Sequence, residues 1–325
     1  MIQVSFLRPL MAKVIIISGP TATGKTRSSI LLAKKIDAEI VNFDSLLFYK
    51  ELSIGTAKPT LEEQGGVIHH LINVVSVKTP LNASDFILKA ERKIEEILSQ
   101  NKNVILVGGS AFYLRALIKG MYDDNPISNE LRSEVEDLFE DKGIDPFIDF
   151  LKKHDPNSLE NLHPNDHYRL LRAYEYFKST GLPISKQKKK LDQNDPYDFS
   201  RNNHPHWDII HIHLDLPKNQ HFELIQKRTK KMVEEGLIKE VENLLQKGFS
   251  GEEKPLKSIG YKETIAYIKG EFKGLQEYRE RISISTRQLA KSQRTFFKKI
   301  HPKLEFNSFE FIDYLNQNNL SFLKI

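Results

Sequence analysis

The stretch GPTATGKT, at Gly19 to Thr26, combines residue types that could bind a phosphate group. Its glycines let backbone N–H groups converge on phosphate oxygens, and it lies between a β-branched strand pattern at Val14 to Ile17 and a helical pattern at Ser28 to Ile36. Lys25 would add a positive charge and Thr26 a hydroxyl ligand for Mg²⁺. This setting predicts a phosphate-binding loop (P-loop) rather than an ordinary glycine turn.

The strand pattern at Asn103 to Val107 lacks the acidic residue that usually accompanies such a loop. A nucleotide triphosphatase holds its Mg²⁺ with a carboxylate at a strand end, but the strand pattern at Asn103 to Val107 runs into Gly108-Gly109-Ser110. This argues against a kinase. Asp44 instead follows the strand pattern Glu39 to Phe43, at the end where open α/β sheets present functional groups. Asp44 could cap a turn, or it could act as a general base beside the loop.

The order of apolar segments predicts an α/β fold with a P-loop NTPase-like parallel sheet. A helix is expected at Ser84 to Gln100, with Ser84 as its N-cap. From Tyr122 to about Asp198 the pattern is helical and highly charged, and the strand pattern returns only at Asp208 to Leu216. The rest, from Lys218 onwards, reads as helical.

These patterns predict a discontinuous catalytic core interrupted by an all-helical insertion domain. The core would comprise residues 1–121 and 201–325, ending in C-terminal helices, and the insertion would comprise residues 122–200. One further pattern is the alternation of His211, His213 and Asp215 along one strand face. Its spacing could hold a metal ion, although a polar cleft wall is the ordinary interpretation.

The composition fits a soluble globular protein. The chain has 325 residues, 39% of them hydrophobic, and no cysteine, which excludes disulfides, Cys-ligated zinc and a thiol nucleophile. Met1 to Leu10 lacks a signal-peptide cleavage site, and no apolar run reaches membrane-spanning length. We therefore expect a monomer that works in the cytoplasm without contacting a membrane.

Basic residues concentrate near the C-terminal end of the chain. Residues 279–303 contain eight Lys or Arg and one acid, in a protein with a pI of about 9.0. A solvated helix face is the ordinary interpretation of such a stretch, but beside a phosphate site a nucleic-acid backbone is a serious alternative ligand. Four of these residues recur at helical spacing and would form one basic stripe: Arg287, Lys291, Arg294 and Lys298.

Further blocks make the chain resemble the tRNA dimethylallyltransferases of the bacterial type. IGTAKP followed by LVGG and TRQLAK is far more specific than a P-loop alone, and the resemblance extends to about Lys299. The matching blocks are GPTATGKT at 19–26, Asp44-Ser45, IGTAKP at 54–59, HHLI at 69–72, SDF at 84–86, LVGGSAFYLRAL at 106–117, HPND at 163–166 with Arg169 and Arg172, SIGYKE at 258–263 and TRQLAKSQ at 286–293.

The resemblance implies transfer of a dimethylallyl group from its pyrophosphate to the exocyclic amine of the adenosine directly 3′ of the anticodon. Lys25, Arg228 and a Thr26-bound Mg²⁺ would stabilise charge on the leaving pyrophosphate, and Asp44 would remove the amine proton. Ser110 could contact the leaving oxygen, cap a helix, or do both. The implied pyrophosphate-binding residues are Gly19, Thr21, Ala22, Thr23, Gly24, Lys25 and Thr26.

The implied second substrate is a tRNA anticodon stem-loop, clamped by the insertion and the TRQLAK helix while the target base is flipped out. The tRNA-binding residues by this resemblance are Ser45, Lys58, His167, Arg169, Arg172, Lys262, Arg287, Gln288, Lys291 and Arg294. The chain departs from the usual family residues in these blocks, which affects the expected RNA preference and not the reaction. The departures are Leu47, Tyr168, Lys262, Glu263 and Ser292.

Three alternatives remain open from the sequence. An isopentenyltransferase acting on free adenine nucleotide would share the donor and the loop, but would not need the insertion or the basic stripe. A P-loop small-molecule kinase lacks its strand-end acid here. A non-catalytic RNA-binding protein with this fold would not need Lys25, Thr26 and Asp44.

Overall fold

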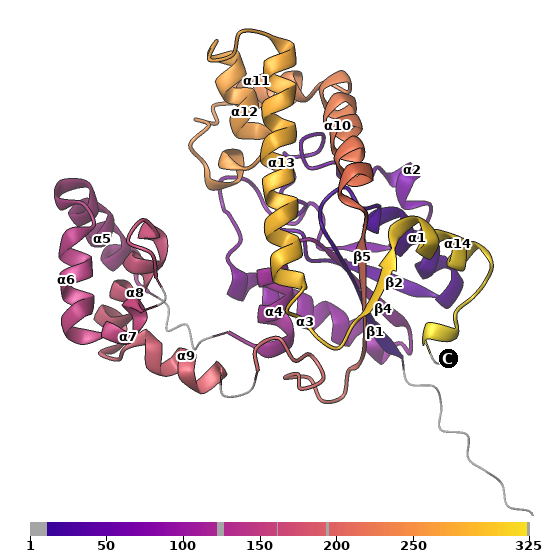
Figure 1. Cartoon of the computed structure of the whole chain (residues 1–325), viewed down its shortest axis with the longest axis horizontal. Coiled ribbons are helices and arrows are strands. Elements are labelled where there is room, and N and C mark those ends of the chain that lie inside the picture. Colours follow the sequence, from indigo (N-terminus) through magenta and orange to yellow (C-terminus); the bar gives the residue numbers. More distant parts are fainter. Residues whose placement is uncertain (1–11, 122–126, 161, 193–194, 324–325) are drawn as a thin grey trace, which may run out of the picture. The chain divides into compact units, whose positions relative to one another are not determined.

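The computed structural model describes residues 12–121, 127–160, 162–192 and 195–323. These form two compact units, one of Met1–Lys119 with Phe199–Ile325 and the other of Gly120–Asp198 (Figure 1). The N-terminal segment judged not to be a signal peptide, and the predicted first residue of the insertion at 122, lie outside the described residues.

The first unit is built on a six-stranded parallel sheet in the order β3-β2-β4-β1-β5-β6, which confirms the predicted α/β fold. Ser18, at the end of β1, is in register with Gly108 of β4 and His213 of β5. The carboxyl ends of these three strands therefore lie side by side. The strands are β1 (Lys13–Ser18), β2 (Ala38–Asn42), β3 (His69–His70), β4 (Asn103–Gly108), β5 (Asp208–Asp215) and β6 (Leu304–Asn307).

The central strands could be predicted because parallel strands are covered on both faces and so read as continuous β-branched runs. Every residue of β1 is buried, with Ile15, Ile16 and Ile17 fully inaccessible. The two edge strands, β3 and β6, were not predicted. β3 has only two residues and β6 is partly exposed, so neither carries an apolar pattern, and the prediction of helix alone after Lys218 is wrong at β6.

Helices of the first unit cover the sheet and build a second apolar cluster beyond it. Phe311 and Leu315 of α14 join β1 residues in the sheet core, while Tyr261 and Tyr278 of α12 and α13 pack with Leu52 in the second cluster. The helices are α1 (Lys25–Ile36), α2 (Leu61–Gln64), α3 (Ala83–Ser99), α4 (Ala111–Lys119), α10 (Lys218–Glu234), α11 (Leu237–Gln246), α12 (Tyr261–Ile268), α13 (Leu275–Phe297) and α14 (Ser308–Asn316).

The start of α3 corrects one prediction. Asn82, not Ser84, is the N-cap: its side chain accepts the Asp85 N–H at 2.9 Å, and the Asp85 carboxylate accepts the Asn82 N–H in return. Ser84 lies in the first turn. The signal was the spacing of Asn82 and Asp85, since this reciprocal pairing satisfies two backbone donors at once.

The only regular secondary-structure elements among the described residues of the second unit are helices. Its core packs Leu151 against Leu170 and Ala173. The buried carboxylate of Asp155 accepts hydrogen bonds from the hydroxyls of Ser158 and Ser185 and so ties the start of α9 to α7. Its helices are α5 (Asn129–Lys142), α6 (Asp145–His154), α7 (Pro156–Leu159), α8 (His167–Thr180) and α9 (Ile184–Asp192).

None of the helices in the described parts of the chain combines the length and the apolar character needed to cross a membrane.

Gly19 sets how closely the loop after β1 approaches β5. It has a φ of +151°, and a Cβ atom there would lie 2.2 Å from the Leu214 carbonyl oxygen. We expect Gly19→Ala to lower the free energy of unfolding by more than the about 1–3 kcal/mol that backbone strain alone costs, because β5 would have to move. The thermal midpoint of unfolding measures this loss. The control is Gly248→Ala, which has a φ of +83° but no neighbouring atom within 4 Å. Equal losses in the two variants would contradict the close approach.

Candidate active site

The segment Gly19 to Thr26 links the end of β1 to the start of α1 and leaves the helix N-terminus open. Gly24 precedes α1 with a φ of +80°, and no side chain caps the helix. No acidic residue lies in its first turn. The first N–H groups of a helix have no partner within it, so this N-terminus is suited to bind an anion.

The side chains of the loop divide between internal bonds and the open site. The buried Thr23 hydroxyl donates to the Pro20 carbonyl at 2.9 Å and so stabilises the loop itself. The exposed Thr26 hydroxyl forms no hydrogen bond with any described residue. It is free to reach a ligand, as the predicted Mg²⁺ role requires.

Lys25 lies at the centre of this site. Its Nζ donates to the Pro20 carbonyl at 2.6 Å. Burial lowers the pKa of Lys25 to about 8, and the positive charge of Arg228 acts in the same direction, whereas Asp44 and Asp215 oppose the shift. An anionic ligand would therefore stabilise the charged form of this amine.

Asp44 follows β2 and is oriented by its own strand. The Asn42 side chain accepts the Asp44 N–H at 2.9 Å and donates to its carbonyl at 3.0 Å. The Leu46 N–H approaches Oδ1 at 3.3 Å. One oxygen of Asp44 therefore caps a turn, and the other, Oδ2, has no hydrogen-bond partner among the described residues.

Ser110 and Gly109 follow β4 on the same edge. The Ser110 hydroxyl oxygen accepts the Ser45 N–H at 3.0 Å, which leaves its own proton available. A Cβ atom on Gly109 would lie 2.5 Å from Gln293 Nε2 and 3.6 Å from Asp44 Oδ2. The glycine pair that replaces a strand-end acid therefore lets Gln293 and Asp44 approach the loop.

Arg228, on α10, joins two loops that are far apart in the sequence. Its guanidinium donates to the Thr21 hydroxyl at 3.1 Å and to the Thr56 carbonyl at 3.2 Å. Burial lowers the pKa of Arg228, while the Asp44 carboxylate opposes that shift. Of the residues predicted to act in catalysis, Lys25, Asp44 and Ser110 thus follow the carboxyl ends of β1, β2 and β4. Arg228 reaches the loop after β1 from α10.

The loop that contains IGTAKP is held by a carboxylate that the sequence did not point out. Glu240, on α11, accepts the N–H groups of Ser53, Ile54 and Gly55 at 2.8 to 3.2 Å and the Tyr261 hydroxyl at 2.6 Å. Lys58, predicted to contact tRNA, is turned inward within this region. Its Nζ donates to the Tyr49 carbonyl at 2.6 Å, and burial lowers the pKa of Lys58 to about 8.

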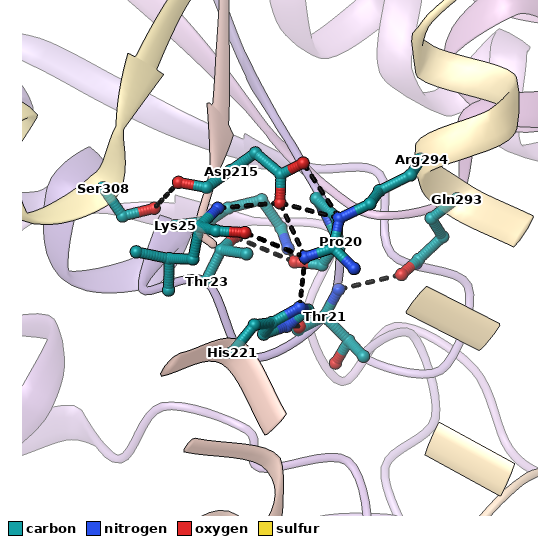
Figure 2. A network of polar contacts seen from close by, with 10 residues as sticks. Pro20, Thr21, Thr23, Lys25, Asp215, His221, Gln293, Arg294 and Ser308 are labelled. Atoms are coloured by element: carbon teal, nitrogen blue, oxygen red, sulfur yellow. Dashed lines mark hydrogen bonds and ion pairs between the residues drawn. The ribbon is translucent and has the colours of Figure 1, made fainter. Parts of the chain in front are cut away.

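Gln293 is a second residue that sequence reasoning missed. Its Oε1 accepts the Thr21 N–H at 2.8 Å (Figure 2). Its Nε2 donates to the Gly109 carbonyl at 3.0 Å, so one side chain connects the loops after β1 and β4. The only signal was its place at the end of the TRQLAKSQ block, because its contacts depend on the packing of α13.

The predicted basic stripe on α13 is not uniform. The Arg287 guanidinium lies over the Phe222 ring, 4.1 Å from its centre, and Lys291 and Lys298 are exposed, without an ion pair to any described residue. Arg294 instead turns inward: its side chain is 24% exposed and binds the Asp215 carboxylate and the His221 ring (Figure 2). It also donates to the Leu216 carbonyl. Arg294 therefore differs from the other three members of the predicted stripe, because a carboxylate of the protein already pairs with it.

The other predicted tRNA-binding residues lie in both units. Within α8 of the second unit, Arg169 is exposed and pairs with Asp166 at 2.8 Å, and Arg172 pairs with Glu175 at 3.3 Å. His167 packs edge-on against Phe139. In the first unit, Ser45 is half-buried beside Ser110, whereas Lys262 and Gln288 are exposed.

Some departures from the family pattern have a structural explanation. Glu263 is buried and accepts the Gly260 N–H at 2.8 Å at the start of α12. The Ser292 hydroxyl donates to the Gln288 carbonyl of its own helix at 3.2 Å. Tyr168 is 72% exposed and Leu47 is half-buried. Glu263 and Ser292 therefore bear on the local stability of their helices, whereas Leu47 donates its N–H to the Asp44 carbonyl at 3.3 Å.

The pair His211 and His213 is buried beneath the loop and does not line a cleft. The Ser18 hydroxyl lies between the rings, 2.7 Å from one and 3.0 Å from the other. Burial lowers the pKa of His211 to about 3 and of His213 to about 4. No cluster of three or more His, Asp or Glu among the described residues could hold a metal ion, so the structure does not support this metal site. An ion at Thr26 would have to draw most of its ligands from water and substrate, as Mg²⁺ commonly does.

Comparisons with known proteins agree on one family. The family model described as IPP transferase matches residues 47–300. The chain is 39% identical over 287 residues to tRNA dimethylallyltransferase 2 of Geotalea uraniireducens, covering 88% of this chain and 89% of that protein. It is 36% identical to the tRNA dimethylallyltransferase of Acetivibrio thermocellus, covering 93% of each.

Solved structures give the same result. The full-length tRNA isopentenylpyrophosphate transferase of Bacillus halodurans matches with a TM-score of 0.67 and 30% identity, covering 96% of this chain and 97% of that one. A eukaryotic dimethylallyltransferase acting on tRNA matches with a TM-score of 0.77 and 27% identity, covering 95% of this chain and 77% of that one.

The lowered pKa of Lys25 predicts a pH dependence of anion binding. Below about pH 8 the amine of the unliganded protein is mostly charged and attracts a pyrophosphate group, and above about pH 8 it is mostly neutral. We expect the Kd for dimethylallyl pyrophosphate to rise by up to about tenfold per pH unit above this value, because binding must then take up a proton. Titration calorimetry from about pH 7 to about pH 9 would measure this. Lys25→Arg, which stays charged, should remove the dependence. A flat wild-type profile would contradict it.

Proposed function

We propose, from the premise that this chain belongs to the IPP transferase family, that it prenylates tRNA. A dimethylallyl group would pass from dimethylallyl pyrophosphate to the exocyclic amine of the adenosine 3′ of the anticodon, and pyrophosphate would leave. The observation that carries this reading is the uncapped N-terminus of α1. Asp44 acts electrostatically on Lys25 there, and Gly109 and Ser110, not an acid, follow β4. We further propose a cytoplasmic enzyme that works as a monomer.

The donor half of the proposed site would stabilise the leaving group. The N–H groups at the start of α1 would bind the pyrophosphate. As the C–O bond breaks and negative charge grows on the leaving oxygen, the attraction of Lys25 and Arg228 for that oxygen would strengthen. The Ser110 hydroxyl accepts the Ser45 N–H and would donate its own hydrogen bond to the leaving oxygen. Mg²⁺, held by the Thr26 hydroxyl together with substrate oxygens and water, would neutralise further charge when bound.

The acceptor half of the proposed site depends on Asp44. The exocyclic amine of adenosine is a poor nucleophile because its lone pair is delocalised into the ring. As its nitrogen forms the new bond to carbon, it must lose a proton, and Asp44 Oδ2 is the carboxylate oxygen without a hydrogen-bond partner among the described residues. Asn42 fixes the backbone of Asp44 and so keeps this oxygen in place.

The proposed RNA-binding residues follow the exposure that the structure gives. Arg287, Gln288 and Lys291 on α13 are exposed, and so is Lys262 on α12. We propose these four residues as contacts for the anticodon stem-loop. Ser45 and three residues of the insertion would join them: His167, Arg169 and Arg172. Lys58 and Arg294 are instead engaged within the first unit.

Labelled donor distinguishes this function from its alternatives. The protein is incubated with Mg²⁺, radiolabelled dimethylallyl pyrophosphate and either an anticodon stem-loop with adenosines beside the target, AMP or ATP. We expect label in the stem-loop far above that in AMP, because a free nucleotide offers no backbone to the exposed basic residues. Equal labelling of AMP would indicate the free-nucleotide enzyme. ATP turnover without prenyl transfer would indicate a kinase.

Asp44→Asn tests the general base. The amide keeps the size and the bond to the Leu46 N–H but cannot take up the amine proton, so kcat should fall about 10²- to 10⁴-fold while donor Kd stays nearly constant. Asp313→Asn, an exposed carboxylate on α14, is the matched control and should behave as wild type. Retention of most of the turnover by Asp44→Asn would leave Asp44 with a turn-capping role only.

A further inference from the structure

We propose that Arg294 acts on the pyrophosphate-binding loop, through His221, as a positioning residue and not as a contact for tRNA. This inference rests on the proposed function, because it concerns how the donor site of that reaction is shaped. The residue on which it depends is Thr21, at the turn of the loop.

Every polar group of Thr21 is held by a side chain from α10 or α13. Gln293 accepts its N–H at 2.8 Å, and His221 Nε2 lies 2.7 Å from its carbonyl oxygen (Figure 2). Arg228 donates to its hydroxyl at 3.1 Å. A loop residue bonded at all three groups has little freedom to turn. The conformation of the loop is therefore set by helices that lie about 200 or more residues further along the chain.

The hydrogen bonds of His221 require a single neutral tautomer. The Thr21 carbonyl can only accept, so Nε2 must carry the proton, and the Arg294 guanidinium can only donate, so Nδ1 must be unprotonated. Burial lowers the pKa of His221, and the charge of Arg294 acts in the same direction. Arg294 thereby fixes which ring nitrogen donates to the loop.

Arg294 is itself fixed at the end of β5. Its Nε lies 2.9 Å from both oxygens of Asp215. Its Nη2 lies 2.8 Å from Asp215 Oδ1 and donates to the Leu216 carbonyl at 3.3 Å. A guanidinium that already pairs with a carboxylate and is three-quarters buried is poorly available to bind an RNA phosphate. The polar chain runs from Asp215 through Arg294 and His221 to Thr21.

This chain has a consequence for the anion site through the planarity of the peptide. The carbonyl of Thr21 and the N–H of Ala22 belong to one trans peptide and point in opposite directions. Holding the carbonyl at His221 directs the Ala22 N–H away from that ring, and we place it toward the pyrophosphate. Ala22 has a φ of +61°, a conformation that non-glycine residues adopt at a cost, so the orientation needs support.

The test compares two cations of the same helix, Arg294→Gln and Lys291→Gln. We expect Arg294→Gln to raise the Kd for dimethylallyl pyrophosphate, measured without tRNA, by about tenfold, which equals about 1.4 kcal/mol, and to leave the salt slope of tRNA binding unchanged. Lys291→Gln should leave donor Kd unchanged and reduce the magnitude of the salt slope by about one. The reverse pattern would overturn the proposal.

His221 variants separate positioning from general stability. His221→Gln keeps an N–H group that can donate to the Thr21 carbonyl, whereas His221→Leu fills the same space without one. We therefore expect His221→Gln to bind dimethylallyl pyrophosphate more tightly than His221→Leu. Adding Arg294→Gln to His221→Leu should cause little further loss, because both act through one contact. Additive losses, or equal binding by the two His221 variants, would contradict the relay. Failure of the wild-type protein to bind the donor at all would refute the proposed function itself.

Discussion

The uncapped N-terminus of α1 is the constraint to which the rest of the site is fitted. Backbone N–H groups that lack protein partners are costly unless water or a ligand satisfies them, and here no side chain does so. The nearby cations then suit a ligand with several negative oxygens, and the carboxylate of Asp44 approaches from a different strand. Burial of Lys25 makes the site favour an anion, since an anionic ligand stabilises the charged amine that burial disfavours.

Much of this arrangement could be predicted from the sequence because it is local or strongly patterned. The P-loop and the β1 run are contiguous, and Asp44 directly follows a buried strand, so the sheet edge and its main reactive groups could be placed. The short edge strands could not, because β6 is partly exposed and its pairing with β5 depends on a distant segment.

The rest of the candidate site could not be predicted because it depends on side-chain partners from distant elements. Gln293, His221 and Glu240 have ordinary sequence surroundings, and only packing brings them to the loops they hold. Lys291 and Arg294 are alike in the sequence, being cations on one helix. What separates them is the carboxylate of Asp215, which helical spacing does not reveal.

The discontinuous build of the first unit determines when this site exists during synthesis. β1 lies between β4 and β5, and the partners of Thr21 come 200 and 272 residues later in the chain. A ribosome that has made only the N-terminal third has therefore produced the phosphate-binding sequence without the strand and helices that shape it. The nascent polypeptide therefore completes this loop and its supports only after α13 has emerged from the ribosome.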